Sequence, residues 1–506
     1  MDLFHNLILG FGVAVSPIHL LYALIGVLLG TLIGVLPGVG PVATIAMLLP
    51  ITFNLSPVAA LIMLAGIYYG AQYGGSTTAI LVNIPGESSS VVTCLDGYQM
   101  ARQGRAGPAL AIAAIGSFFA GCVATLIIAV AAPPLAEVAL KFGPSEYFSL
   151  MVFGLIAATV LARGSLIKAI AMVVFGLLLG LVGTDVNSGV LRFTFGIPEL
   201  SDGIGFVVVA MGMFGTAEII ANLDLKDSRE VFTSKVTHLY PTKEDLKRSW
   251  ASIMRGTLLG SCLGILPGGG ALLASFGAYT LEKKVSSHPE QFGKGAIEGV
   301  AGPESANNSA ATGAFVPMMA LGIPTSPVTA VMIAAIMVHG ILPGPMLIQQ
   351  QPELFWGFVA SMYVGNVVLL ILNLPMVGLF VNLLRVPYSY LYPCILCFCI
   401  LGTYSVSNST VDVWILLVMG GIGYVLRKFG YDLAPVALGL VLAPMLELSL
   451  RQSLAMSAGD YGIFFQRPIA IVMFGFCALL LVLSLKPFFF KSGKDWRSEV
   501  GLEDQS

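Results

Sequence analysis

Residues 26–40 of the chain read GVLLGTLIGVLPGVG, and residues 256–270 read GTLLGSCLGILPGGG. The two stretches are identical at nine of their 15 positions, at a shift of 230 residues. A second match follows in the same order at a shift of 239, in which Ala71, Gly74, Ile84 and Pro85 align with Ala310, Gly313, Ile323 and Pro324. Two motifs that recur in one order at nearly one spacing indicate an internal repeat. The sequence therefore predicts two related halves.

The chain around both copies is strongly apolar. Of its 506 residues, 57% are hydrophobic and 10% are charged, whereas a soluble domain carries roughly 25% charged residues. Several nearly charge-free blocks approach the roughly 20 apolar residues that a helix needs to cross a bilayer. These blocks are 20–36, 109–132, 148–161, 167–182, 204–221, 354–374, 413–426, 436–446 and 469–485. We expect an all-α polytopic membrane protein with roughly 10–12 segments in the lipid bilayer. The formal net charge of −2 gives no reason to expect a nucleic-acid partner.

One long hydrophilic stretch, residues 222–250, lies inside the chain and separates the two apolar halves. Six Lys and Arg residues lie in it, interleaved with acidic residues. The predicted organisation is an N-terminal segment (1–17), a first membrane half (18–221), a cytoplasmic linker (222–250), a second membrane half (251–450), a final membrane-helix region (451–485) and a cytoplasmic tail (486–506).

The distribution of cations predicts how the halves are oriented in the membrane. With the linker in the cytoplasm, one self-consistent assignment leaves only Lys141, Arg192, Arg451 and Arg467, of 25 Lys and Arg, on the outer side. The LPGVG and LPGGG segments are then the tips of re-entrant hairpins, and each repeat crosses the membrane an odd number of times. An odd number of crossings gives repeats of inverted topology, which many secondary transporters have.

Four segments rich in Gly and Pro are predicted to break the helical pattern at membrane depth: residues 36–41, 74–90, 266–270 and 302–326. Proline removes a helical donor, and glycine permits backbone conformations that other residues avoid. In lipid, each freed N–H or C=O group costs several kcal/mol unless protein, water or a ligand satisfies it. A lone break of this kind could be only a kink, but the duplicated pairs favour a binding centre for transport.

The polar groups in these segments fit an anionic substrate. No Lys or Arg occurs among the first 100 residues, so the first half can offer only hydroxyls and N–H groups at helix starts, which bind carboxylates. Broken-helix carbonyls with Asn83, Asn307 and Asn308 are suitable ligands for a small cation such as Na⁺. The predicted substrate and ion site consists of Gly38, Gly40, Gly74, Gly75, Ser76, Thr77, Thr78, Asn83, Pro85, Gly86, Glu87, Ser88, Ser89, Gly268, Gly269, Gly270, Glu304, Asn307, Asn308, Gly313, Gly322, Pro324 and Thr325.

Two structural readings of these residues stay open. Glu304 with Asn307 and Asn308 could form a satisfied polar helix face, and Glu87 and Asp96 could lie near the membrane interface.

The longest motifs resemble the large membrane subunit, the TctA-type permease, of the tripartite tricarboxylate transporter family. The resemblance covers roughly residues 10–450 and is carried by residues 34–41, 69–87, 95–104, 264–270, 295–308, 321–324 and 343–345. It implies a small four-helix membrane subunit and a periplasmic solute-binding protein as partners. It also implies secondary transport of citrate, other di- and tricarboxylates or aromatic acids, driven by an Na⁺ or H⁺ gradient without a further cofactor. The Ser/Thr, Gly and Asn positions named above are the implied site.

Three other functions compete with this prediction. A channel needs a continuous polar path, whereas duplicated broken helices suit alternating access. An enzyme needs a nucleophile with its base or a metal cluster, and five dispersed histidines supply neither. A scaffold without transport does not explain the polar breaks. We therefore expect a carrier rather than an enzyme, with a channel or a carrier that acts without a binding protein as the alternative.

Overall fold

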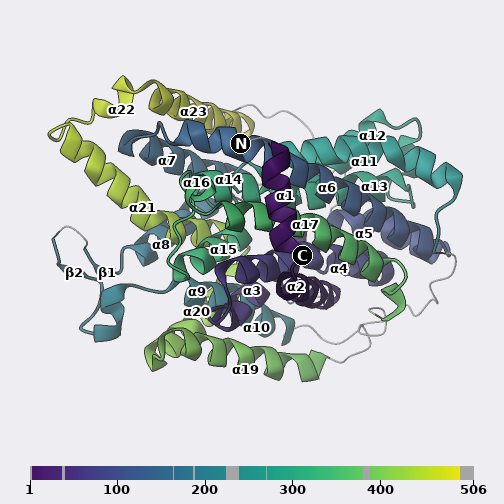
Figure 1. The fold of residues 1–506 in the computed structure, drawn as a ribbon, viewed down its shortest axis with the longest axis horizontal. Helices are drawn as coiled ribbons and strands as arrows, with labels where there is room; N and C mark the ends of the chain where they lie inside the picture. Colours follow the sequence, from purple (N-terminus) through teal and green to yellow (C-terminus); the bar gives the residue numbers. More distant parts are fainter. Residues whose placement is uncertain are drawn as a thin grey trace.

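The computed structural model describes residues 3–36, 40–162, 165–185, 188–223, 239–268, 270–379 and 388–489. The described chain is almost entirely helical (Figure 1). Six of its helices are long and apolar enough to cross a membrane, and seven further apolar helices are 10–17 residues long. The prediction of an all-α polytopic membrane protein is confirmed.

The elements of the first half are α1 (Leu3–Ala14), α2 (Pro17–Val35), α3 (Pro41–Thr52), α4 (Pro57–Val82), η1 (Ser88–Ser90), α5 (Val91–Arg102), α6 (Ala106–Ala139), α7 (Pro144–Leu161), α8 (Leu166–Gly180), β1 (Gly183–Thr184), β2 (Leu191–Arg192), η2 (Pro198–Asp202), α9 (Phe206–Ala210), the π-helical turn η3 (Met211–Thr216) and α10 (Ala217–Leu223). Those of the second half are α11 (Lys243–Gly264), α12 (Gly270–Val285), η4 (Pro289–Gln291), α13 (Glu298–Gly313), α14 (Phe315–Leu321), α15 (Pro327–Val338), α16 (Leu347–Gln350), α17 (Pro352–Asn373), α19 (Tyr388–Ser407), α20 (Thr410–Lys428), α21 (Ala434–Met456), α22 (Ile463–Gln466) and α23 (Pro468–Phe489).

The repeated glycine motif packs each half in the same way. In the first half α2 lies against α4, and in the second half α11 lies against α13. A Cβ atom on Gly30 would lie 2.4 Å from the carbonyl oxygen of Ile67, and one on Gly260 would lie 2.3 Å from that of Ala306. Ile67 and Ala306 are related by the same shift of 239 residues as the second sequence match. Only glycine permits backbones to approach so closely, as in other small-residue membrane helix pairs.

Helices from the two halves also pair with one another. The first half's α8 packs against α21 of the second half, and the first half's η3 packs against α20. Glycine again sets the distance, since a Cβ on Gly176 would lie 2.3 Å from the carbonyl oxygen of Val436, and one on Gly212 would lie 2.7 Å from that of Leu416. These contacts pack the two halves directly against each other.

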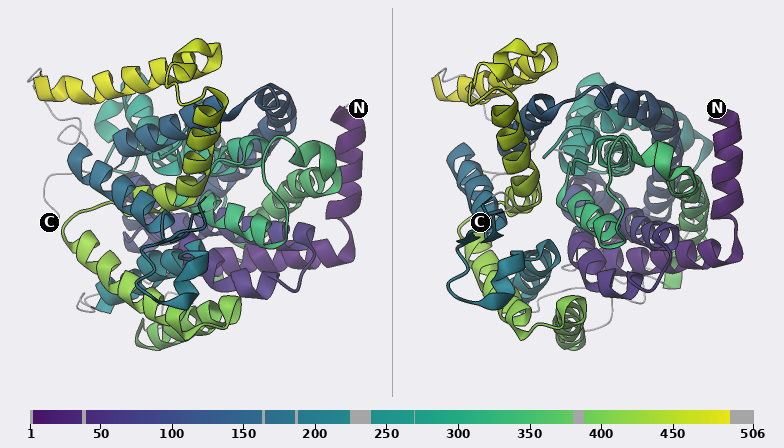
Figure 2. Two further views of the ribbon diagram at one scale, coloured as in Figure 1. Left: turned by 90° about the vertical axis from the view of Figure 1, so that its left-hand side faces the viewer. Right: turned by 60° about the vertical axis from the view of Figure 1, so that its left-hand side comes forward.

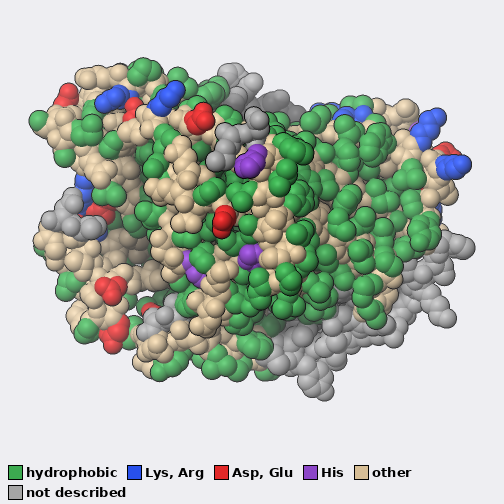
Figure 3. All heavy atoms as spheres, in the orientation of Figure 1, with side chains coloured by type: hydrophobic (Ala, Val, Ile, Leu, Met, Phe, Trp, Pro, Cys, Tyr) green, Lys and Arg blue, Asp and Glu red, His purple; other side chains and the backbone are tan. Residues whose placement is uncertain are grey.

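The periphery is covered by the first and last helices. α1 packs against α17, and α23 packs against α7. Figure 2 shows α21, α22 and α23 on the side of the molecule away from α1. A broad part of the face in Figure 3 is hydrophobic, and most of its Lys, Arg, Asp and Glu side chains lie toward the edges. Such a surface suits contact with lipid.

The structure corrects three local predictions. A two-stranded antiparallel hairpin, β1–β2, follows α8, although no strand was expected. Residues 74–82 do not break the helix, because α4 continues to Val82 and its glycines make room for neighbouring backbone. Residues 302–313 are likewise helical. Pro303 lies inside α13, where it removes a single backbone donor near the start of the helix.

Charged contacts join residues that the cation distribution assigns to one side of the membrane. Arg105 donates to Asp245 at 2.5 Å, which joins the α5–α6 loop to the start of α11. Burial by itself would raise the pKa of Asp245, but hydrogen bonds from Thr242 and the charge of Arg105 lower it overall. Among the residues assigned to the other side, Arg192 forms two hydrogen bonds with Glu447, at 2.8 and 3.1 Å.

The orientation and the inverted topology remain predictions, and labelling from outside intact cells tests them. In a background without reactive native cysteines, Phe195→Cys and Leu342→Cys should react with an impermeant reagent, because both side chains are highly exposed, at 85% and 78%. Tyr240→Cys, at 84% exposure, should react only after the membrane is opened. Ready reaction of Tyr240→Cys in intact cells would reverse the topology. The linker residues 224–238 and the tail from residue 490 lie outside the described residues.

Candidate functional site

A buried carboxylate, Glu304 on α13, lies where elements of both halves meet. Its side chain is only 1% exposed. Ser76 on α4 donates a hydrogen bond of 2.5 Å to Oε2, and Thr93 on α5 donates one to Oε1. Both carboxylate oxygens are therefore held by first-half hydroxyls, and hydrogen bonds to an ionised group are among the strongest in proteins.

A second carboxylate, Glu87, follows the end of α4. The helix ends at Asn83, whose positive φ of 57° turns the chain back onto α4. Gly86 permits this return, because a Cβ there would lie 2.0 Å from the carbonyl oxygen of Gly34. Gly75 permits it too, since a Cβ there would lie 2.8 Å from Cγ of Glu87. These glycines are required for close packing, and that packing places Glu87.

Glu87 also contacts both halves. Its Oε1 accepts hydrogen bonds from Ser89 of its own loop and, at 3.0 Å, from Nδ2 of Asn307 on α13. Ser89 also donates to Oε1 of Gln72 on α4, at 3.2 Å. Asn307 lies three residues after Glu304, so the two side chains share one face of the helix. We call the set Gln72, Ser76, Glu87, Ser89, Thr93, Glu304 and Asn307 the carboxylate cluster.

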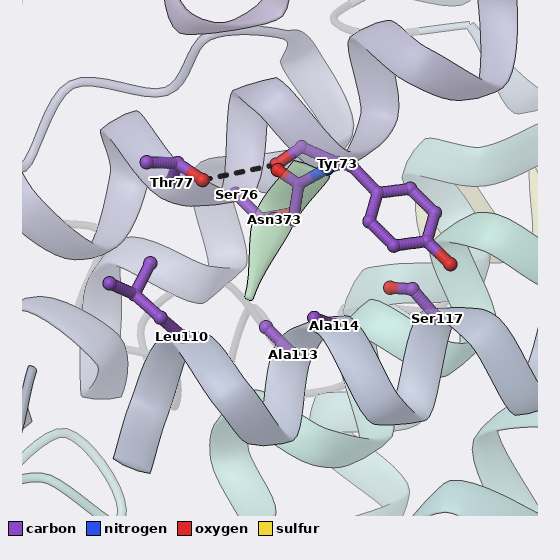
Figure 4. Close-up of a pocket in the computed structure, with 8 residues that line it drawn as sticks. All are labelled: Tyr73, Ser76, Thr77, Leu110, Ala113, Ala114, Ser117 and Asn373. Atoms are coloured by element: carbon purple, nitrogen blue, oxygen red, sulfur yellow. Dashed lines mark hydrogen bonds between the residues drawn. The ribbon is translucent and has the colours of Figure 1, made fainter. Parts of the chain in front are cut away.

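A small pocket adjoins the carboxylate cluster between α4 and α6. Its lining residues are Tyr73, Ser76, Thr77, Leu110, Ala113, Ala114, Ser117 and Asn373. Figure 4 shows Tyr73 and Ser117 at one end of this pocket, with Thr77 bonded to the carbonyl of Tyr73 at 3.4 Å. Ser117 also accepts a hydrogen bond of 2.6 Å from Nδ2 of Asn308. The pocket is thus lined both by Ser76, which bonds to Glu304, and by Ser117, which bonds to Asn308.

In the second half, the predicted helix breaks at residues 266–270 and 323–326 contact each other, away from the carboxylate cluster. The backbone N–H of Gly268 donates to the carbonyl of Thr325 at 2.9 Å. Gly268 has a positive φ of 86°, and a Cβ there would lie 2.2 Å from Cα of Ala158 on α7. The N–H groups of Thr325 and Ser326 both bond to Oγ1 of Thr329, which closes the start of α15.

The structure brings some predicted site residues together and leaves others apart. Six lie in or beside the carboxylate cluster, namely Gly75, Ser76, Glu87, Ser89, Glu304 and Asn307, and Thr77 and Asn308 adjoin it. Gly74 and Thr78 pack against α2, Gly313 packs against α11, and Gly322 ends α14. The side chains of Asn83 and Ser88 are exposed, Pro85 is half-buried beside Gly86, and Pro324 is buried beside Thr325. Gly40 and Gly270 begin α3 and α12. Gly38 and Gly269 lie outside the described residues.

The sequence reasoning missed four polar residues of this region: Gln72, Tyr73, Thr93 and Ser117. Gln72 and Tyr73 lie within the quoted motif 69–87, and Gln72 is an amide in a helix that contains no charged residue. That signal could have identified Gln72. Thr93 and Ser117 are single hydroxyls, and such residues usually bond to their own helix.

Within the described part of the chain, no cation pairs with either of the two carboxylates. Among the described salt bridges, none involves Glu87 or Glu304. In the same part of the chain, no group of three or more His, Cys, Asp or Glu side chains could hold a metal ion.

Asp96, the other acidic residue of the first-half motifs, is not part of the carboxylate cluster. It accepts from the N–H groups of Gly295 and Ala296 and from the hydroxyl of Tyr279.

Comparison with known proteins agrees with the quoted motifs. The model of the "Tripartite tricarboxylate transporter TctA family" matches residues 20–438. A protein of Agrobacterium vitis described as an "uncharacterized 52.8 kDa protein in TAR-I ttuC' 3'region" is 57% identical over 487 residues, which are 96% of this chain and 97% of the relative. An Agrobacterium vitis protein described by its place in the TAR-II ttuC' 3' region is 49% identical over 245 residues, which are 48% of this chain and all of the relative. No solved structure matches. The chain belongs to the tripartite tricarboxylate transporter TctA family and is a multi-pass membrane permease.

Proposed function

We propose that this permease imports small organic carboxylates of the tricarboxylate or dicarboxylate type across the bacterial inner membrane, driven by a cation gradient. Its partners are a small four-helix membrane subunit and a periplasmic solute-binding protein that delivers the substrate. The membership in a tripartite family supports the presence of partners.

The carboxylate cluster carries this proposal. Glu304 is buried and Glu87 is half-buried in the helical bundle, and no described Lys or Arg pairs with either of them. Two like unit charges 4 Å apart repel each other by about 4 kcal/mol at an effective dielectric constant of 20. A carboxylate substrate therefore cannot approach this cluster unless a cation enters as well. This repulsion makes substrate binding depend on a co-transported Na⁺ or H⁺.

The starts of α3 and α12 are the proposed contacts for the substrate. A Cβ added at Gly40 or at Gly270 would meet no atom within 4 Å, so the backbone there is open. Helix starts with free N–H groups bind carboxylates through those groups and the helix dipole. The start of α15 is less suitable, because Thr329 already occupies two of its N–H groups.

Reconstitution in vesicles tests the proposal. Citrate and other radiolabelled di- and tricarboxylates are offered to the chain alone and to the chain with its small subunit and binding protein. An Na⁺ gradient and a pH gradient are imposed separately. We expect uptake only with all three proteins and with one of the two gradients.

Two results would contradict parts of the proposal. Full-rate uptake by the chain alone would refute dependence on the binding protein and support a carrier that acts by itself. Gradient-independent ion currents far above carrier rates would refute the carrier and support a channel.

A further inference from the structure

The amide of Asn307 has an oxygen without a partner. The side chain is 1% exposed, and Oδ1 makes no hydrogen bond within the described part of the chain. Its Nδ2 donates to Glu87, and a carboxylate oxygen only accepts, so the nitrogen is the atom that must face Glu87. Oδ1 is therefore an acceptor left unsatisfied next to an acidic side chain. A buried polar atom of this kind calls for a partner, such as a water molecule or an ion.

Only a positively charged group or a hydrogen-bond donor can satisfy Oδ1. Asn307 adjoins Glu87, and the groups joined to Glu87 by hydrogen bonds offer further oxygen atoms: the hydroxyl of Ser89 and, through it, Oε1 of Gln72. Carboxylate, amide and hydroxyl oxygens are the ligands of hard cations. The described residues here include no thiol or imidazole contact to Glu87, so a soft transition metal has no matching ligand.

The ligand set favours a monovalent ion. Both oxygens of Glu304 already accept hydrogen bonds from Ser76 and Thr93, which leaves Glu87 as the carboxylate that can contact the ion directly. Ca²⁺ takes about 6–8 oxygen ligands, several of them carboxylates, and Mg²⁺ demands a near-octahedral site, whereas one carboxylate with neutral amide and hydroxyl oxygens suits a singly charged ion. Glu304 adds its negative charge without contacting the ion.

We propose that Glu87 and Asn307 bind Na⁺, with Ser89 and Gln72 as further oxygen ligands. This inference rests on the proposed function, since it names the coupling ion of that transport and the residues that hold it. Because Glu87 and Gln72 belong to the first half and Asn307 to the second, the ion connects the two halves. Its binding would also remove the repulsion between Glu87 and a carboxylate substrate.

Binding of Na⁺ is measured without transport. The purified full-length chain is titrated with NaCl at constant ionic strength, with choline chloride or KCl as replacement, and its thermal unfolding midpoint is followed. A ligand that binds only the folded state raises that midpoint in a concentration-dependent way. We expect saturable stabilisation by Na⁺ and little by K⁺ or choline.

Two variants locate the site, and two controls match them. Glu87→Gln keeps the size of the side chain but removes its charge, and Asn307→Ala removes the unsatisfied oxygen. We expect either change to weaken the apparent Na⁺ affinity at least tenfold. Glu353→Gln, an exposed acid at the start of α17, and Asn366→Ala, a buried amide of the same helix, should leave the affinity unchanged.

The outcomes separate this inference from the proposed function. If Na⁺ stabilises Glu87→Gln and Asn307→Ala as it does the unaltered chain, the assigned site is wrong even when Na⁺-driven uptake is observed. If acidification stabilises the chain, Na⁺ does not, and Glu87→Gln abolishes the pH effect, the ion is a proton and the assignment to Na⁺ is wrong. If both variants lose the Na⁺ response but no carboxylate is taken up, the site stands and the proposed substrate fails.

Discussion

Replacing Gly30 or Gly260 with valine should prevent the protein from folding stably in the membrane. At both positions a Cβ would lie within 2.4 Å of a backbone carbonyl oxygen of the neighbouring helix. Neither α4 nor α13 can yield by rotating a side chain, because the atoms that clash are backbone. Overpacking a well-packed interior costs about 1–3 kcal/mol even where side chains can adjust. We expect a loss of more than about 3 kcal/mol, visible as poor abundance and a broad gel-filtration profile.

The chain offers a matched control for this prediction. Gly421 lies on α20, and a Cβ there would meet no atom within 4 Å. Gly421→Val should therefore accumulate and migrate like the unaltered protein, since valine is tolerated on an open membrane helix surface. Equal behaviour of Gly30→Val and Gly421→Val would mean that α2 and α4 are farther apart in the membrane than in the structure.

The sequence predicted the helical class well because that class depends on local pattern. Hydrophobic blocks of membrane length indicate helices, and the repeated motif preserves the glycines that each half needs for its α2–α4 or α11–α13 contact. The packing of α8 against α21 and of η3 against α20, each a contact between the two halves, was not predictable. Contacts between segments more than 200 residues apart leave no periodic signal in one sequence.

The site was predicted in its composition but not in its geometry. Glycine and proline were taken as helix breaks, yet Gly75 lies inside a continuous helix and makes room for Glu87. A glycine that permits close approach and one that ends a helix look alike in a sequence. Long-range hydrogen bonds are a second feature that the sequence does not show. Only the fold reveals that Thr93 donates to the carboxylate of Glu304, 211 positions away.

Replacing Glu304 with glutamine should nearly abolish uptake while the protein still folds. Glutamine has almost the same shape, and the hydroxyls of Ser76 and Thr93 can rotate to donate to its oxygen and accept from its nitrogen. What is lost is a negative charge near the proposed ion. A unit charge about 5 Å from a cation contributes about 3 kcal/mol at an effective dielectric constant of 20. We expect a fall in uptake of roughly 100-fold.

A second substitution separates charge from structure at this position. Glu304→Ala removes the charge and also leaves the buried hydroxyl of Thr93 without its carboxylate partner, at a cost of about 1–3 kcal/mol, whereas Ser76 keeps its hydrogen bond to the carbonyl of Gln72 at 3.0 Å. It should therefore lose both uptake and thermal stability, whereas Glu304→Gln should lose only uptake. Normal transport by Glu304→Gln at normal abundance would mean that Glu304 only fastens α13 to α4 and α5. The charge that governs coupling would then be that of Glu87 alone, because no other carboxylate of the carboxylate cluster remains.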